Sequence, residues 1–160
     1  MSVKLLNTQH LKLWIVNMFD NILVVCVGNI CRSPTAEFLL QQALPNKTVH
    51  SAGLGALVGH DTDATAKQVA EQQGTECPTH SARQLTKEMC RQADVILVME
   101  DKHKKAVSRL APEVRGKTFL LGQWNNNQEI PDPYKKSEEA FQHVYQLIAN
   151  NCELWSKKLK

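Results

Sequence analysis

The sequence lacks the features that mark membrane-spanning and secreted chains. The apolar patch at residues 11–16 is far shorter than the roughly 20 residues that a membrane helix requires. No small-residue cleavage site follows this patch, so it is not predicted to be a signal peptide. We therefore expect no stable membrane insertion.

An excess of charge of one sign is also missing. The 160 residues contain 19 Lys and Arg against 16 Asp and Glu, a formal net charge of +3. Part of the basic excess lies in the C-terminal residues 157–160, which we interpret as a solvated helix end, and the rest is scattered. The charge argues against a nucleic-acid partner, and the composition gives no indication of an oligomeric state.

The cysteines lack the spacing of a metal site. There are five, no Cys-x2-Cys pair occurs among them, and Cys77, Cys90 and Cys152 show no ligand spacing. We therefore expect no bound metal. An odd number of cysteines, of which Cys26 beside the cationic Arg32 is expected to be a free thiolate, suits a reducing cytoplasm better than a secreted disulfide framework.

No internal repeat, low-complexity tract or interdomain linker divides the chain, which is long enough to bury one core. We predict a single domain over residues 18–160. Residues 1–17 form an N-terminal extension that is either disordered or not native, because Met18 could itself be the natural start. The alternative is a real arm that packs on the domain.

Alternating apolar and amphipathic segments predict an α/β fold. We expect strands at 21–26, 48–51, 94–99 and 117–120, and helices near 34–44, 62–73, 86–91, 101–110 and 137–156. This alternation is typical of a four-stranded parallel sheet with helices on both faces, a Rossmann-like arrangement. Ligands in such folds bind beyond the carboxyl ends of the strands, and Cys26 lies at one of these ends.

A phosphate-binding loop is predicted between the first strand and the first helix. Ser33 is placed to cap the helix, and Pro34 suits its first position. The helix N-terminus and a neighbouring Arg32 favour an anion in the loop, so we expect Cys26 to be a nucleophilic thiolate. The expected phosphate-binding residues are Val27, Gly28, Asn29, Ile30, Cys31, Arg32 and Ser33, with Gly28 and Asn29 suited to positive φ angles.

This loop, Cys-x5-Arg-Ser near the chain start, resembles that of the low-molecular-weight protein tyrosine phosphatases. Residues 131–134, Pro-Asp-Pro-Tyr, are similar to the Asp-Pro-Tyr general-acid loop of that family. Segments 51–57, 80–83 and 94–100 resemble its bacterial branch in order and spacing, and the likeness covers roughly residues 18–157. It is strongest to the phosphatases partnered with bacterial tyrosine autokinases in capsule and exopolysaccharide assembly.

The resemblance implies roles for particular residues. Cys26, Arg32 and Asp132 would be catalytic: Cys26 forms a cysteinyl-phosphate, and Asp132 protonates the leaving phenolate and then activates water. Tyr134 and Leu57 would form the walls of a slot for phenyl phosphate. Thiolate, guanidinium and carboxyl suffice for this reaction, so no cofactor is expected. The implied partner is a phosphotyrosine protein, most plausibly a tyrosine autokinase tail.

Two further residues carry open alternatives. Cys31 resembles a second cysteine of many family members, which would form a reversible disulfide with an oxidised Cys26, or it is merely a small buried residue. His80 either donates a hydrogen bond that steadies Asn29 or is a surface loop residue.

Two other functions remain as alternatives to phosphatase activity. A thioredoxin-coupled arsenate reductase shares this kind of loop but relays oxidation through two further cysteines, and the available pair, Cys77 and Cys90, is wrongly clustered for that relay. A catalytically silent phosphotyrosine-binding module is the third hypothesis, and the intact Cys26, Arg32, Ser33 and Asp132 argue against it.

Overall fold

The computed structural model describes residues 19–160. The extension predicted at residues 1–17 lies outside the described residues. No helix within residues 19–160 is both long enough and apolar enough to cross a bilayer.

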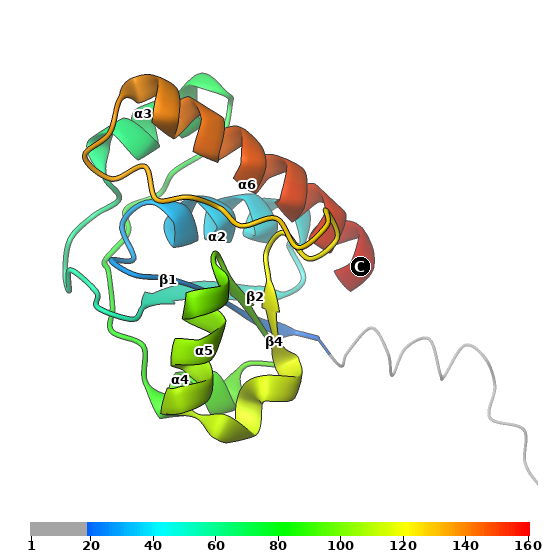
Figure 1. The fold of residues 1–160 in the computed structure, drawn as a ribbon. Helices are drawn as coiled ribbons and strands as arrows, with labels where there is room; N and C mark the ends of the chain where they lie inside the picture. The colour runs from blue at the N-terminus through cyan, green and yellow to red at the C-terminus, as the bar shows by residue number, and fades with distance from the viewer. Residues whose placement is uncertain (1–18) are drawn as a thin grey trace, which may run out of the picture.

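Four parallel strands form one sheet in the order β2-β1-β3-β4 (Figure 1). They are β1 (Asn21–Cys26), β2 (Thr48–Gly53), β3 (Val95–Val98) and β4 (Thr118–Leu120). The two central strands, β1 and β3, consist mainly of buried β-branched and aliphatic residues, as expected for strands covered on both faces. Cys26 pairs with Gly53 at the carboxyl end of β1, so the segments that follow both strands start side by side.

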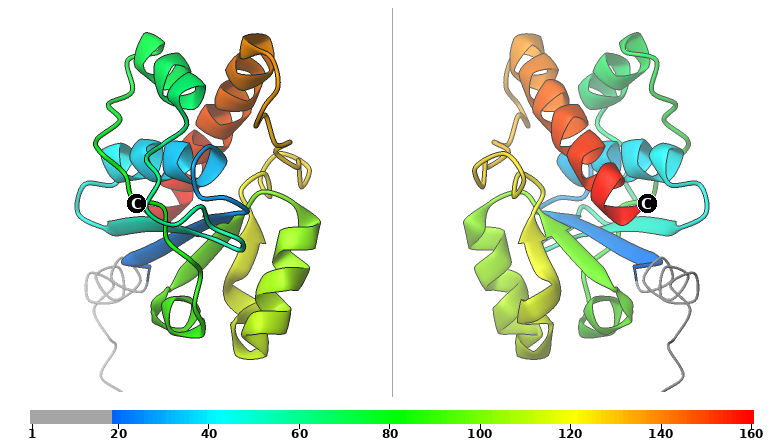
Figure 2. Two further views of the ribbon diagram at one scale, coloured as in Figure 1. Left: turned by 90° about the vertical axis from the view of Figure 1, so that its left-hand side faces the viewer. Right: turned by 90° about the vertical axis from the view of Figure 1, so that its right-hand side faces the viewer.

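Helices cover both faces of the sheet, as the two views of Figure 2 show. On one face lie α2 (Arg32–Ala43) and α6 (Glu138–Leu159), with α3 (Ala64–Gln72) packed against both helices. On the other face lie α4 (Lys87–Gln92), α5 (Asp101–Leu110) and the 3-10 helix η1 (Pro112–Lys117). Alternate side chains of β1 enter the two cores: Ile22 and Val24 pack toward α2 and α6, and Leu23 and Val25 pack on the opposite side.

The predicted α/β architecture is confirmed, and most element boundaries agree with the predicted ones to within three residues. The last helix runs to Leu159, and apolar residues at helical spacing along it are buried: Phe141, Val144, Tyr145, Ile148 and Trp155. The helix predicted from residue 62 starts at Ala64, because the Asp63 side chain accepts hydrogen bonds from the N–H groups of Thr65 and Ala66 and caps the helix there.

Candidate active site

A tight loop between β1 and α2 forms the floor of the site. Six consecutive carbonyl groups of this loop, residues 26–31, accept hydrogen bonds from donors of other residues. The donors are the backbone N–H groups of Leu54, Gly55, Leu57, Asp63 and Thr35, and the Nε2 atom of His80. The loop is therefore held in shape from several segments of the chain.

These contacts determine where the loop N–H groups point. A trans peptide group directs its C=O and N–H in opposite directions, and the described residues contain no cis peptide bond. With the carbonyl groups of residues 26–31 turned to outside donors, the N–H groups of residues 27–32 face the concave side of the loop. The result is a ring of donors at the N-terminus of α2, which suits a phosphate group.

Asn29 is the residue that locks the loop to its surroundings. It is fully buried and has a φ of 58°, in the left-handed region that asparagine tolerates. Its Nδ2 donates to Ser33 Oγ (2.8 Å) and Ser51 Oγ (2.9 Å), and its Oδ1 accepts from the Arg83 N–H (3.0 Å). His80 Nε2 lies 2.7 Å from the Asn29 carbonyl oxygen. Of the two alternatives for His80, the structure therefore shows the hydrogen bond that steadies Asn29.

The positive φ predicted for Gly28 is wrong, because only Asn29 in this loop adopts one. Glycine is instead required at position 53, where β2 ends. A Cβ atom there would lie 2.4 Å from the carbonyl oxygen of Val27, so any side chain would push the loop away.

The Ser33 hydroxyl contacts the Cys26 sulfur and does not cap the N-terminus of α2. The helix begins at Arg32, one residue before the predicted cap, and Cys31 at the N-cap makes no side-chain capping bond. The Ser33 Oγ atom lies 2.9 Å from Cys26 Sγ and accepts a hydrogen bond from Asn29. Its hydroxyl proton is therefore available to the sulfur, and the predicted capping role of Ser33 is wrong.

The guanidinium of Arg32 is buried and held by partners that the sequence analysis did not identify. Its Nη1 donates to Glu100 Oε2 (2.7 Å) and to the carbonyl oxygen of Ile130 (2.8 Å). Burial alone would raise the pKa of Glu100, but the hydrogen bond and charge of Arg32, with Lys102 nearby, hold it below its usual value.

His103 supports Glu100 from the first turn of α5. Burial, together with the charge of Arg32, lowers the pKa of His103 to about 4, so the ring is neutral at neutral pH. Its Nδ1 accepts from the Glu100 N–H (3.2 Å), which leaves the ring proton on Nε2, 3.2 Å from Glu100 Oε2. His103 thus contacts both the backbone and the side chain of Glu100, whose carboxylate binds Arg32.

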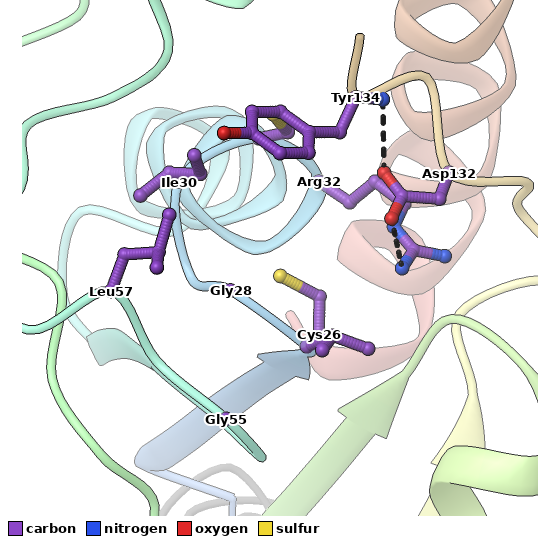
Figure 3. A pocket seen from close by; sticks show the side chains of 10 residues that line it. Cys26, Gly28, Ile30, Arg32, Gly55, Leu57, Asp132 and Tyr134 are labelled. Carbon is purple, nitrogen blue, oxygen red and sulfur yellow. Dashed lines mark hydrogen bonds and ion pairs between the residues drawn. The ribbon is translucent and has the colours of Figure 1, made fainter.

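A pocket of about 190 Å³ opens above Cys26 (Figure 3). Leu57, Ile30 and Tyr134 form apolar walls, and Asp132 stands at its edge. The Asp132 Oδ1 accepts from the Tyr134 N–H (3.1 Å), and its Oδ2 lies 3.7 Å from Arg32 Nη2. Every residue predicted for the nucleophile, the acid and the walls therefore lines one cavity.

The cysteines other than Cys26 lie in different environments. Cys31 is buried in the loop, and all five cysteines are free. Cys77 packs with the α3 and α6 side of the sheet, whereas Cys90 belongs to the core on the opposite face. The sheet thus separates the two cysteines that an arsenate reductase relay would need. Within residues 19–160, no three His, Cys, Asp or Glu side chains gather as a metal site would require.

Comparison with known proteins places this site in a family. The family model described as low molecular weight phosphotyrosine protein phosphatase matches residues 21–160. The chain belongs to this family. The chain is also 54% identical over 142 residues to the probable low molecular weight protein-tyrosine-phosphatase AmsI of Erwinia amylovora, covering 89% of this chain and 99% of that protein.

Solved structures of similar phosphatases share the fold. The structure of Vibrio vulnificus Wzb in complex with benzylphosphonate matches with a TM-score of 0.86 at 53% identity, over 88% of this chain and 99% of that one. The YwlE arginine phosphatase from Geobacillus stearothermophilus matches with a TM-score of 0.80 at 35% identity, over 86% and 91% of the two chains. The low-molecular-weight phosphatase fold therefore extends over the whole described domain.

Proposed function

We propose that this chain hydrolyses phosphotyrosine in proteins through a cysteinyl-phosphate on Cys26. The observation that carries the proposal is the position of the Cys26 sulfur at the floor of an apolar-walled pocket, below a ring of N–H groups and beside the buried guanidinium of Arg32. Asp132 at the edge of the same pocket supplies a carboxyl group where a leaving oxygen would emerge.

The geometry supports a reaction in two steps. In the first, the Cys26 thiolate attacks phosphorus while the phosphorus–oxygen bond to the phenol breaks, and the Asp132 carboxyl gives its proton to the departing oxygen. In the second, the Asp132 carboxylate takes a proton from water as that water attacks phosphorus. The S–P bond then breaks, and the thiolate that leaves is stabilised by the Ser33 hydroxyl, 2.9 Å away.

The apolar walls favour a phenyl ring as the leaving group. Among residues 19–160, five large apolar side chains are exposed, and three of them, Val27, Leu57 and Tyr134, line this pocket. A fourth, Val58, follows Leu57 directly. A ring seated between Leu57 and Tyr134 would bury apolar surface on both of its faces. The benzylphosphonate bound in the related Wzb structure, a phenyl ring joined to a phosphonate through a methylene group, is consistent with this choice.

Hydrolysis of phosphoarginine is the competing activity, because an arginine phosphatase is among the structural relatives. The decisive test compares phosphate release from matched phosphotyrosine and phosphoarginine peptides, with a Cys26→Ser variant as the inactive control. We expect turnover of the phosphotyrosine peptide, with an S–P adduct trapped by rapid quenching. Preference for phosphoarginine, or arsenate-dependent thiol consumption without phosphatase activity, would overturn the proposal.

The physiological substrate that we propose is the phosphorylated tail of a tyrosine autokinase of polysaccharide export, acting in the cytoplasm. Support comes from the likeness of the active-site and acid-loop sequences to the phosphatases partnered with such kinases. Turnover of phosphopeptides from the tyrosine kinase of the same cell should exceed that of unrelated phosphotyrosine peptides of equal length and charge. Equal turnover of both sets would argue against this assignment.

A further inference from the structure

Positive charge is concentrated on one segment of an otherwise slightly acidic domain, so the scattered distribution inferred from the sequence is wrong. Residues 101–117, which form α5 and η1, contain six Lys and Arg against two Asp and Glu. The rest of residues 19–160 contains eleven Lys and Arg against fourteen Asp and Glu. One of the six cations, Lys117, donates to the backbone carbonyl groups of Arg91 and Ala93. We call the other five, which are exposed or half-exposed, the basic stripe: Lys102, Lys104, Lys105, Arg109 and Arg115.

Most of this charge is not neutralised by the protein itself. Of the two acidic residues, Asp101 pairs with Lys105 (3.1 Å), and Glu113 pairs with Arg91 outside the stripe (2.7 Å). No ion pair within the described part of the chain involves Lys104, Arg109 or Arg115. Three cations are therefore available to a partner.

The stripe also has the shape of a binding surface. Lys104, Lys105, Arg109 and Arg115, with Asp101 and Ser108, line a cleft of about 400 Å³ between α5 and η1. A shallow depression bordered by cations can seat an extended anionic chain, and it is the charge of its lining that favours this partner.

The stripe starts at the edge of the candidate active site. Helix α5 begins directly after Glu100, the residue that holds Arg32, and Lys102 Nζ lies 3.7 Å from Glu100 Oε1. From there α5 runs away from the carboxyl ends of the strands (Figure 1). Its ten residues span about 15 Å, the reach of about five residues of extended peptide.

From this arrangement we propose that the basic stripe binds an acidic segment of the phosphoprotein substrate, within about five residues of the phosphotyrosine in the pocket. The inference rests on the proposed phosphotyrosine hydrolysis and adds a substrate class to it. Charge complementarity along α5 and η1 would orient the peptide and strengthen its binding, without touching the reacting atoms.

The test uses the full chain and two phosphotyrosine peptides that are identical except at the third to fifth residues from the phosphotyrosine. These residues are Glu in one peptide and Gln in the other. The pair is made twice, once with these residues before the phosphotyrosine and once with them after it. The test variant is the double charge reversal Lys104→Glu and Arg109→Glu. The matched control is Lys157→Glu and Lys160→Glu, which makes the same change in net charge at the far end of α6. p-Nitrophenyl phosphate serves as a substrate with no flanking residues.

We expect the unmodified protein to prefer the Glu peptide through a lower KM, and we expect added salt to weaken this preference. The test variant should lose about five- to tenfold in kcat/KM on the Glu peptide, with the Gln peptide and p-nitrophenyl phosphate within about twofold of the unmodified protein. The control variant should retain the preference. Unchanged hydrolysis of the small ester shows that the test variant is folded.

Equal turnover of the Glu and Gln peptides by the unmodified protein would overturn this inference and leave the proposed function intact. Failure to hydrolyse any phosphotyrosine peptide would instead overturn the proposed function. If the protein bound phosphatidylserine vesicles through Lys104 and Arg109 and showed no peptide preference, the stripe would be a membrane-binding surface, and the inference would be wrong.

Discussion

At the scale of single residues, the acid loop shows how a carboxyl group is aimed. Pro131 and Pro133 restrict the backbone on both sides of Asp132, and Pro133 is buried while Asp132 remains half exposed. The hydrogen bond from the Tyr134 N–H fixes one carboxyl oxygen, which leaves the other directed to Arg32 (Figure 3). The carboxyl group is thus anchored at the edge of the pocket.

Replacing Asp132 by Asn should separate substrates by their leaving groups. Phenolic esters with basic leaving groups need a proton in the transition state, so kcat should fall by about a hundredfold to ten-thousandfold. Esters whose leaving group needs no proton should be hydrolysed at nearly the original rate in the phosphorylation step. Pre-steady-state kinetics on a leaving-group series measures this, and equal losses across the series would remove Asp132 from the acid role.

Cys31 should protect the nucleophile from irreversible oxidation. Attack of the Cys31 thiol on a Cys26 sulfenic acid would form a disulfide and release water, and a thiol reductant would restore both cysteines. Burial, with the charge of Asp63, raises the pKa of Cys31 well above its usual value, so this capture should become faster as the pH rises.

The measurement is the activity recovered with dithiothreitol after brief peroxide treatment. The unmodified protein should recover more completely than a Cys31→Ser variant, by a margin that grows with pH. Equal recovery would mean that Cys31 only fills space in the loop, where it is indeed buried.

At the scale of elements, α2 carries a partly buried carboxyl group next to the loop it supports. Glu37 lies in the middle of α2, with its Oε2 3.9 Å from His80 Nδ1. Burial raises the pKa of Glu37 to about 7, against the opposing effects of the Arg83 charge and of hydrogen bonds with Ser51. The ionised form of this side chain is therefore unfavourable in the folded domain.

The sign of its effect on stability follows from proton counting. Between pH 4.5 and about 7, the folded protein keeps a proton on Glu37 that the unfolded chain has released, so this group reduces stability as the pH rises. A Glu37→Gln variant removes the effect. Its free energy of unfolding relative to the unmodified protein should increase across that window by up to about 3 kcal/mol.

Urea unfolding at several pH values from 4.5 to 8 checks this expectation. The matched control is Glu76→Gln, which removes an exposed carboxylate in a loop. For Glu76→Gln we expect a stability difference from the unmodified protein that does not change with pH. The same pH-independent difference for Glu37→Gln would contradict the prediction.

The predictability of the elements depended on how local their determinants are. The buried β-branched run of β1 and the amphipathic pattern of α6 are determined by neighbouring residues, so their positions could be predicted closely. The cap of α2 could not be predicted, because the Ser33 hydroxyl can either cap the helix or hydrogen-bond to the Cys26 sulfur. In the folded domain it lies 2.9 Å from that sulfur. A competing tertiary contact thus overrode a sound local rule.

A tertiary contact also explains why the sequence analysis did not identify Glu100 as a residue of the site. Glu100 lies 68 positions from Arg32 in sequence, and nothing in its own segment distinguishes it from Asp94 or Asp101 as the partner of a buried guanidinium. The usable signal was its place directly after the apolar run of β3, because the carboxyl ends of adjacent parallel strands meet at one edge. Cys26 was predicted from this rule, and applying it to β3 would have pointed to Glu100.

At the scale of the whole molecule, residues 19–160 contain a complete sheet covered on both faces. Both main cores draw on the central strands β1 and β3 and on helices from the two sides. We propose that residues 18–160 fold independently as a single domain, and this proposal can be tested directly.

A chain that starts at Met18 should fold and act like the full chain. Its urea midpoint should equal that of the full chain within error, and its kcat/KM on a phosphotyrosine peptide should lie within about twofold of that of the full chain. The reason is that every strand and core residue described here is retained. A second truncation that starts at Leu23 is the control. It removes the fully buried Ile22 and should be destabilised by about 2 kcal/mol or more. A clear loss of stability in the first truncation would show that residues 1–17 belong to the domain.

The loop around Cys26 draws its hydrogen bonds from segments that are far apart in the chain, including the residues after β2, the residues before α3 and the segment around His80. Its anion-binding form therefore exists only when those segments are assembled, and an oxyanion that occupies it has no comparable site on the unfolded chain. Binding and heat resistance are then linked by mass action: an inhibitor present at a hundred times its Kd adds about 2.7 kcal/mol to the folded state. Simple thermal-shift screening could thus rank active-site ligands without any turnover assay.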